Sequence, residues 1–172
     1  TSITIPDSVT NIGESAFELS SLKSIELPTS VTIISPRTFY EADDLKSVTF
    51  GNDVTDIGEL TFFNAKKLTS IIPNSVTTIG NDAFNYTDNL ESITIPDSVT
   101  IGSNAFNIIS TNSTVYVIDK SESVTFEQFK YIFNNTTSGH GTITYVDMNT
   151  FTTFIHKNDI DVFNINIIDE LT

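Results

Sequence analysis

The 172-residue sequence contains no cysteine and no tryptophan, and it has eight Lys and Arg residues against 22 Asp and Glu. Without cysteine there is no disulfide framework, thiolate zinc site or thiol nucleophile. The formal charge of −14 argues against nucleic acid and anionic membrane surfaces as partners, because both are bound mainly by basic side chains. No apolar run is long enough to span a membrane, so we expect no direct membrane insertion, and the first residues lack the pattern of a signal peptide. The hydrophobic content of 38% is nevertheless sufficient for a folded core.

Residues that could carry chemistry are equally scarce. The two histidines, His140 and His156, have no motif partner, and His140 lies between glycines. The acidic pairs Asp43-Asp44 and Asp159-x-Asp161 lack the spacing of a calcium loop, so we expect them to lie in solvated turns. No phosphate-binding glycine loop, nucleophile elbow or zinc-ligand spacing is present. We therefore predict no catalytic residue, no metal site and no cofactor, and a chain that is not an enzyme.

A repeated sequence dominates the rest of the chain. The nine residues SITIPDSVT occur at 2–10 and again at 92–100. Between them the pattern V-T-x-I-G-x-x-A-F recurs in looser form, and its valines stand 22 or 23 residues apart, at Val9, Val31, Val54, Val76 and Val99. Five phenylalanines keep the same interval: Phe17, Phe39, Phe62, Phe84 and Phe106. A fixed interval of this length predicts a solenoid, in which each repeat forms one coil and stacks on its neighbours.

Each repeat can be divided into the parts of one coil. Segments 22–27, 45–50 and 90–95 follow the pattern L-x-x-L-x-L, whose alternating end predicts a short strand with one buried face. A proline, or Gly51 in the third repeat, then ends the strand. A Val and an Ile three residues apart are expected to point inward on the return side. We expect a positive φ at the glycines that follow, Gly13, Gly58, Gly80 and Gly102, and a continuous stack of the five phenylalanines.

Two repeats are shorter than the others. One residue is missing between Ile71 and Pro73, and another between Val99 and Ile101. Since each coil contacts only its neighbours, we expect local kinks or bulges at these points.

The motif L-x-S-I-x-I-P-x-S-V-T-x-I-G-x-x-A-F over residues 1–110 resembles the BspA-type leucine-rich repeats, which are typically 22 to 23 residues long. The resemblance implies a repeat solenoid with short parallel strands on its concave face and irregular structure or short strands on its convex side. It also implies binding or adhesion rather than catalysis, since such repeats occur in surface and secreted proteins. One column departs from the Asn of leucine-rich repeats and carries short oxygen-bearing side chains, which we interpret as structural: Ser8, Ser30, Asp53, Ser75 and Ser98.

The sequence divides into three parts. Residues 1–110 hold five repeats, of which the first is truncated, and we expect preceding residues or a partner to cover its open end. Residues 111–150 are predicted to form a small α+β C-terminal cap, with strands at 115–118 and 142–146 and a helix at 125–135 between them. Residues 151–172 read as tail strands that complete the cap, start a further domain or pair with another chain. Packing within this chain is the interpretation we favour.

The outward strand residues form the candidate binding surface on the concave face. They fall into two columns and comprise Ser24, Glu26, Ser47, Thr49, Ser70, Ser92 and Thr94. Such a hydroxyl-rich surface is typical of any solvated strand, but it also suits a protein or glycan ligand. Residues of the kinds that anchor strong interfaces are found elsewhere in the repeats, where Arg37, Tyr40 and Tyr86 are expected on the convex or connecting side.

These observations predict a non-enzymatic adhesion or binding module at an extracellular location, a cell surface or a particle surface. Its partner would be a host or neighbouring surface protein or a glycan, and weak multivalent attachment fits the surface best. The alternative is a structural spacer or assembly component, including a virion-associated or surface-layer one, that contacts other subunits through its tail. Four Asn sequons begin at Asn85, Asn112, Asn134 and Asn135, and in a chain this rich in Asn and Thr chance matches are expected.

Overall fold

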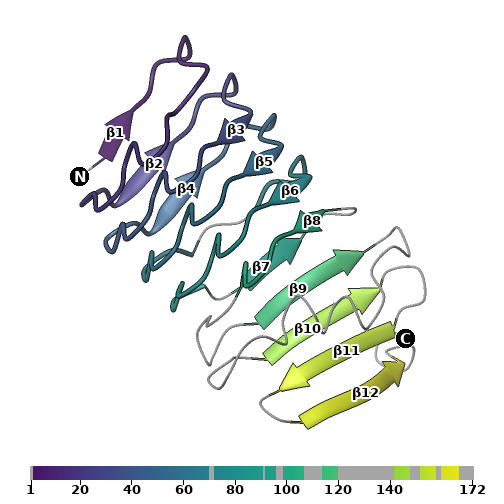
Figure 1. Cartoon of the computed structure of the whole chain (residues 1–172). Coiled ribbons are helices and arrows are strands. Elements are labelled where there is room, and N and C mark those ends of the chain that lie inside the picture. Colours follow the sequence, from purple (N-terminus) through teal and green to yellow (C-terminus); the bar gives the residue numbers. More distant parts are fainter. Residues whose placement is uncertain are drawn as a thin grey trace.

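The structure is a computed structural model that describes residues 2–69, 72–90, 92–95, 99–106, 114–119, 142–147, 152–157 and 160–166. Side chains are described for residues 3–69, 72–90 and 99–106. The coils stack along one axis, with one row of strands on each side of the stack (Figure 1).

The first row contains β1 (Ser2–Thr4), β2 (Ser24–Glu26) and β4 (Ser47–Thr49). They pair in parallel in the order β1-β2-β4, and Ser24 lies opposite Ser2 on one side and Ser47 on the other. The central residues Ile25 and Val48 are buried, while Glu26 and Thr49 face outward. The alternation read from the sequence therefore gives the strands and register that it predicts.

The second row lies on the return side of the coils. It contains β3 (Ile33–Ile34), β5 (Asp56–Ile57), β6 (Thr78–Ile79) and β8 (Thr100–Ile101), paired in parallel in that order. The isoleucines at the second position of β3, β5 and β6 are buried, as expected of residues that point inward. An isolated bridge from Ile12 to Ile34 joins the first coil to this row.

A third sheet continues from the repeats into the C-terminal part, in the order β7-β9-β10-β11-β12. Its strands are β7 (Ser92–Ile95), β9 (Thr114–Asp119), β10 (Thr142–Asp147), β11 (Thr152–Lys157) and β12 (Ile160–Asn166). β7, β9 and β10 are parallel, while β11 and β12 are antiparallel to their neighbours.

This sheet tests part of the C-terminal prediction. The strands expected at 115–118 and 142–146 are confirmed as β9 and β10, and the tail pairs within this chain through β11 and β12. β9 lies one repeat interval beyond β7, with Thr114 opposite Ser92. The helix expected at 125–135 lies outside the described residues, and the domain boundaries stay predictions.

The five phenylalanines form the predicted aromatic stack. Ring centroids of successive residues lie 5.1 to 5.4 Å apart, and the planes of each pair are within 20° of parallel. Phe39, Phe62, Phe84 and Phe106 are fully buried. The edge of the Phe50 ring packs on Phe62, with centroids 6.1 Å apart.

The expectation of positive φ at the repeat glycines is wrong. Their φ angles lie outside the left-handed region, and a Cβ on Gly58, Gly80 or Gly102 would instead lie 2.7, 2.5 or 2.5 Å from a backbone nitrogen of the preceding coil. Glycine is required there because two backbones meet at that point. Positive φ, between 52° and 61°, falls on two other columns of residues: Ser15, Arg37, Leu60, Asp82 and Asn104, and Leu19, Glu41, Asn64 and Tyr86.

The first coil is less buried than the sequence pattern predicts. Ile3 pairs with the buried Ile25, and the repeat pattern places it in the core, but it is 43% exposed. Val9 and Phe17 are only partly covered. Their equivalents Val31 and Phe39 in the second coil are fully buried. The reason is that the first coil has a described neighbour on one side only.

The two short repeats differ in their consequences. At the first, Ile72 is buried in the place that Phe50 occupies one coil earlier, and the described strands on this side belong to two sheets, one ending at β4 and one beginning at β7. At the second, Val99 is only half-buried, yet β8 stays in register with β6. The return row thus absorbs its missing residue without losing its pairing.

Candidate binding surfaces

The predicted concave-face residues are brought together on β2 and β4. Ser24 lies beside Ser47 and Glu26 beside Thr49, so the two columns are in register. Glu26, Ser47 and Thr49 are exposed, and Ser24 is half-buried. Ser92 and Thr94 belong to β7, in a separate sheet, and Ser70 lies outside the described residues.

A hollow of about 480 Å³ adjoins this surface. Its polar lining comes from strand residues Thr4, Ser24, Glu26 and Thr49 and from the turn residues Asp7 and Thr29. The remaining lining is apolar and consists of Ile3, Ile5, Ile25, Leu27 and Pro28. Both charged lining residues, Asp7 and Glu26, are acidic. Sequence reasoning missed the turn residues because strand alternation says nothing about which turn adjoins the face.

A second surface runs across neighbouring coils and is named here the aromatic ridge, made of Arg37, Tyr40, Phe63 and Tyr86. The Tyr40 and Phe63 rings stack with centroids 5.1 Å apart, and Tyr86 meets Phe63 edge-on at 5.3 Å. The Arg37 guanidinium lies 4.1 Å from the centre of the Tyr40 ring. The sequence singled out Arg37, Tyr40 and Tyr86 separately. It missed Phe63, although this residue lies outside the interval of the core phenylalanines and 23 residues from both Tyr40 and Tyr86.

Interactions with acidic side chains hold Arg37 and Tyr40 in place at one end of the aromatic ridge. Arg37 Nη2 donates to Glu18 Oε1 at 2.7 Å, and this bond lowers the pKa of Glu18 and raises that of Arg37. Removal from water, followed by the charge of Glu41 and a hydrogen bond to it, raises the pKa of the Tyr40 phenol. The first ring of the aromatic ridge is therefore held on both sides by partners from this chain.

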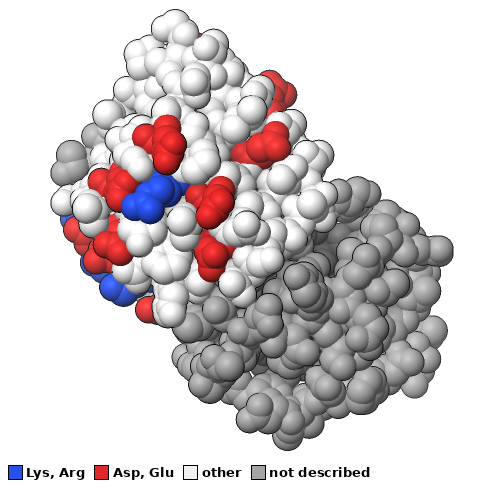
Figure 2. Space-filling model, in the orientation of Figure 1, with Lys and Arg blue, Asp and Glu red and all other residues white. Residues whose placement is uncertain are grey.

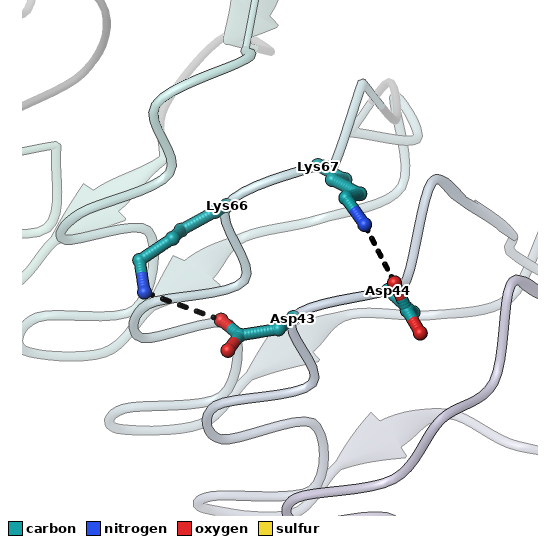
Figure 3. A network of polar contacts seen from close by, with 4 residues as sticks. All are labelled: Asp43, Asp44, Lys66 and Lys67. Atoms are coloured by element: carbon teal, nitrogen blue, oxygen red, sulfur yellow. Dashed lines mark hydrogen bonds and ion pairs between the residues drawn. The ribbon is translucent and has the colours of Figure 1, made fainter.

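Asp43 and Asp44 lie in an exposed turn, as expected, but they are paired with lysines of the next coil (Figure 3). Lys66 lies 3.5 Å from Asp43, and Lys67 Nζ donates to Asp44 Oδ1 at 2.6 Å. The hydrogen bond lowers the pKa of Asp44 and raises that of Lys67.

The serine column has the structural role assigned to it where bonds are seen, since Ser30 and Ser75 donate to the Val9 and Val54 carbonyls at 2.6 Å.

The described residues hold no group of three or more side chains that could ligate a metal ion. Within the same residues no helix is long and apolar enough to cross a membrane. His140 and Asp159 lie outside the described part, and of the side chains of His156 and Asp161, in β11 and β12, nothing is described.

The first of the four sequons is enclosed by the fold. Asn85 is 5% exposed and its Nδ2 donates to Asp82, while the buried Thr87 hydroxyl donates to the Phe84 carbonyl. An acceptor amide in this position is inaccessible to a glycosylating enzyme in the folded chain. The other three sequons lie outside the described residues.

Short parallel strands at an interval of 22 to 23 residues, on both sides of a stack of buried phenylalanines, define a leucine-rich-repeat protein. The family model described as "BspA type Leucine rich repeat region" matches residues 1–113 and 71–170 in six copies. The chain belongs to this family. The second range extends past residue 110, where the repeat pattern in the sequence stops.

Two solved structures are similar to this chain. A leucine-rich repeat protein from Bacteroides ovatus ATCC 8483 is 30% identical, with a TM-score of 0.66, and the match covers 85% of this chain and 36% of that one. A leucine rich cell surface protein from Faecalibacterium prausnitzii A2-165 is 24% identical, with a TM-score of 0.48, over 91% of this chain and 52% of that one. The chain thus spans about a third to a half of these relatives. No curated protein matches it.

Proposed function

We propose that the chain is a non-enzymatic binding module of a cell-surface or extracellular protein, and that it recognises a protein or a glycan through its concave face. The observation that carries the proposal is the in-register array of outward Ser, Thr and Glu side chains on β2 and β4, beside a hollow lined by both polar and apolar residues. Membership of the BspA-type family supports a binding module, since repeat solenoids use such extended faces for recognition.

The chemistry of this face favours many weak contacts over one strong anchor. Its outward side chains on β2 and β4 are hydroxyls and one carboxylate, and none is aromatic. Hydroxyls donate and accept single hydrogen bonds of modest net strength, so one coil holds a ligand poorly. Repetition on neighbouring coils raises the effective concentration of each contact once the first has formed.

The test compares three substitutions on the concave face with three substitutions elsewhere that change the net charge by the same amount. One variant carries Glu26→Lys, Ser47→Lys and Thr49→Lys, and its matched control carries Glu59→Lys, Thr32→Lys and Ser103→Lys, all at exposed positions away from β2 and β4. Binding is measured on a glycan array and on biotinylated surface proteins of epithelial cells. We expect the first variant to lose binding and the control to keep it. Equal binding by both variants would contradict the placement.

An assembly role is a second candidate, favoured by the position of β12 at the end of the five-stranded sheet. A terminal strand presents backbone groups that can pair with another chain. Analytical ultracentrifugation should then show an oligomer that dissociates when proline is placed in β12, for example by Val162→Pro. A chain that stays monomeric at all concentrations would rule this role out.

A further inference from the structure

The aromatic ridge differs in character from the rest of the described surface. Few large hydrophobic side chains are exposed on the described surface. Two of them, Leu19 at 66% and Tyr86 at 40%, occupy equivalent positions in their coils. Glu41, the residue after Tyr40, occupies the same position in the second coil. Leu19 is joined to the aromatic ridge by its backbone, because its N–H donates to the Tyr40 carbonyl at 2.8 Å. Tyr40, Phe63 and Tyr86 lie on successive coils in ring contact, and Tyr86 is the exposed member. Aromatic and Arg side chains of this kind often anchor protein interfaces.

Tyr40, the first ring of the aromatic ridge, already has a cation from this chain over it. A guanidinium lies over Tyr40 and pairs with the carboxylate of Glu18. In the next two coils the column that holds Arg37 holds Leu60 and then Asp82. Among the described residues no cation lies over Phe63 or Tyr86. Tyr86 thus has an exposed ring with no cation over it among the described residues.

The backbone of Tyr86 has the same left-handed conformation as the other residues of its column. Its φ of 61° is in the left-handed region, where a bulky residue costs free energy and where the preceding coil has Asn64. The Tyr86 ring meets Phe63 only edge-on, so packing accounts for part of its surface and not for the exposed part.

Charge selects the partner. Glu18 and Glu41 lie at the end of the aromatic ridge formed by Arg37 and Tyr40, and its one cation, Arg37, is already paired with Glu18. Acidic side chains are also spread over the face of the coils shown in Figure 2, with few basic ones among them. Such a surface attracts basic partners and repels acidic ones.

We propose that the aromatic ridge binds a basic segment of another protein, whose arginine or lysine side chain lies over the Tyr86 ring as Arg37 lies over Tyr40. A guanidinium or ammonium group on the face of an aromatic ring is attracted by the charge distribution of the ring. This surface is separate from β2 and β4. The inference therefore does not rest on the concave-face proposal.

The probe is a fluorescein-labelled hexa-arginine peptide, with hexa-citrulline as the neutral isostere. Affinity is measured by fluorescence anisotropy on the whole chain, and contact by NMR of ring-labelled tyrosine. We expect hexa-arginine to shift the Tyr86 ring signals and hexa-citrulline not to. We expect Tyr86→Leu to weaken hexa-arginine binding by about twofold to fivefold, as loss of an exposed cation–π contact implies.

Two controls separate this contact from nonspecific attraction to an acidic chain. Tyr86→Phe keeps the ring and should bind within about twofold of the wild type. Glu14→Gln removes an exposed charge from the first coil and should leave the Tyr86 shifts in place. Thermal unfolding of each variant shows whether the fold is kept, and if Tyr86→Leu unfolds, the tyrosine NMR of the wild type decides. Unchanged affinity in a folded Tyr86→Leu, equal binding of hexa-citrulline, or shifts confined to other tyrosines would overturn the proposal.

Discussion

The glycine after each return strand lies where the backbones of two neighbouring coils meet. At Gly80 an added Cβ would be 2.5 Å from Glu59 N and 2.7 Å from Gly58 C, and backbone atoms in a stacked coil cannot move away without breaking the ladder. Gly13 has no atom within 4 Å of the same position, because no described coil precedes it. The same residue type at the same phase of the repeat is therefore indispensable in one coil and replaceable in another.

Gly80→Ala should lower the free energy of unfolding by about 1 to 3 kcal/mol, the range expected when a core without free space is overpacked. Gly13→Ala should leave it unchanged or raise it by up to about 1 kcal/mol, since alanine restricts the unfolded chain. Urea denaturation followed by circular dichroism measures both. Equal losses in the two variants would show that something other than coil contact requires the glycine.

Residues with positive φ carry a different constraint. Leu19 is at φ 56° and is 66% exposed, so it bears left-handed strain without much packing in return. Asn tolerates this conformation better and already occupies the same column at Asn64.

Leu19→Asn should raise the free energy of unfolding by about 0.5 to 1 kcal/mol. The matched change Glu14→Asn, at an exposed residue with ordinary φ, should have an effect close to zero. Both follow from the same urea titrations. A loss of stability in Leu19→Asn would mean that packing of the leucine side chain outweighs the strain of its backbone.

At the scale of the element, each coil is stabilised by contact with the coils on either side. Phe62 stacks on Phe39 and Phe84 and also meets the edge of Phe50, whereas Phe17 stacks on Phe39 alone and is only partly buried. The cost of losing a ring should therefore depend on its place in the stack.

Phe62→Ala should cost about 3 to 5 kcal/mol, as full burial of a phenylalanine implies. Phe17→Ala should cost roughly half of that or less, because one face of its ring has no described neighbour. Thermal and urea unfolding of both variants test the ranking. Equal costs would contradict a nearest-neighbour account of the solenoid.

Exposed ion pairs add a contribution that depends on pH. The pKa of Asp44 is lowered by its bond to Lys67, so the pair stabilises the fold above the ordinary value of 3.8 and loses this effect as pH falls through the lower folded value. The pKa of Lys67 is raised from 10.5, so on the basic side the effect is lost as pH rises through the higher folded value. The pair is exposed, and salt should weaken it.

Lys67→Met should therefore be less stable than the wild type at about pH 7 in low salt, and the difference should vanish near about pH 2. Lys46→Met, which removes an exposed lysine with no ion pair among the described residues, should show no such pH dependence. Melting temperatures across the pH range give the comparison. A difference that persists in acid would assign the effect to packing of the lysine stem.

At the scale of the whole molecule, periodicity made most of the fold predictable. The interval of 22 to 23 residues fixed which residues stack, and the alternation in 22–27 and 45–50 fixed which face is buried. Contacts that depend on the distance between coils could not be read in this way. The role of Gly80, the exposure of Ile3 and the ion pairs of Asp43 and Asp44 all depend on what the neighbouring coil places opposite them.

The candidate surfaces divide in the same way. The concave columns of Ser24 and Glu26 follow from strand alternation, but Asp7 and Thr29 join the hollow only through the path of the turns. The repeat interval assigns Phe62 to the core and leaves Phe63 outside it, but it does not say which rings Phe63 contacts.

The sequence by itself determined that this chain is a stack of leucine-rich repeats with a phenylalanine in every coil, because a repeated unit can bury its apolar residues only against copies of itself. Tertiary structure alone decided that Arg37, Tyr40, Phe63 and Tyr86 form one surface. The steps of 23 residues from Tyr40 to Phe63 and from Phe63 to Tyr86 place these residues on successive coils. Which of their rings meet depends on the path of the turns and on the stacking of coils about 5 Å apart.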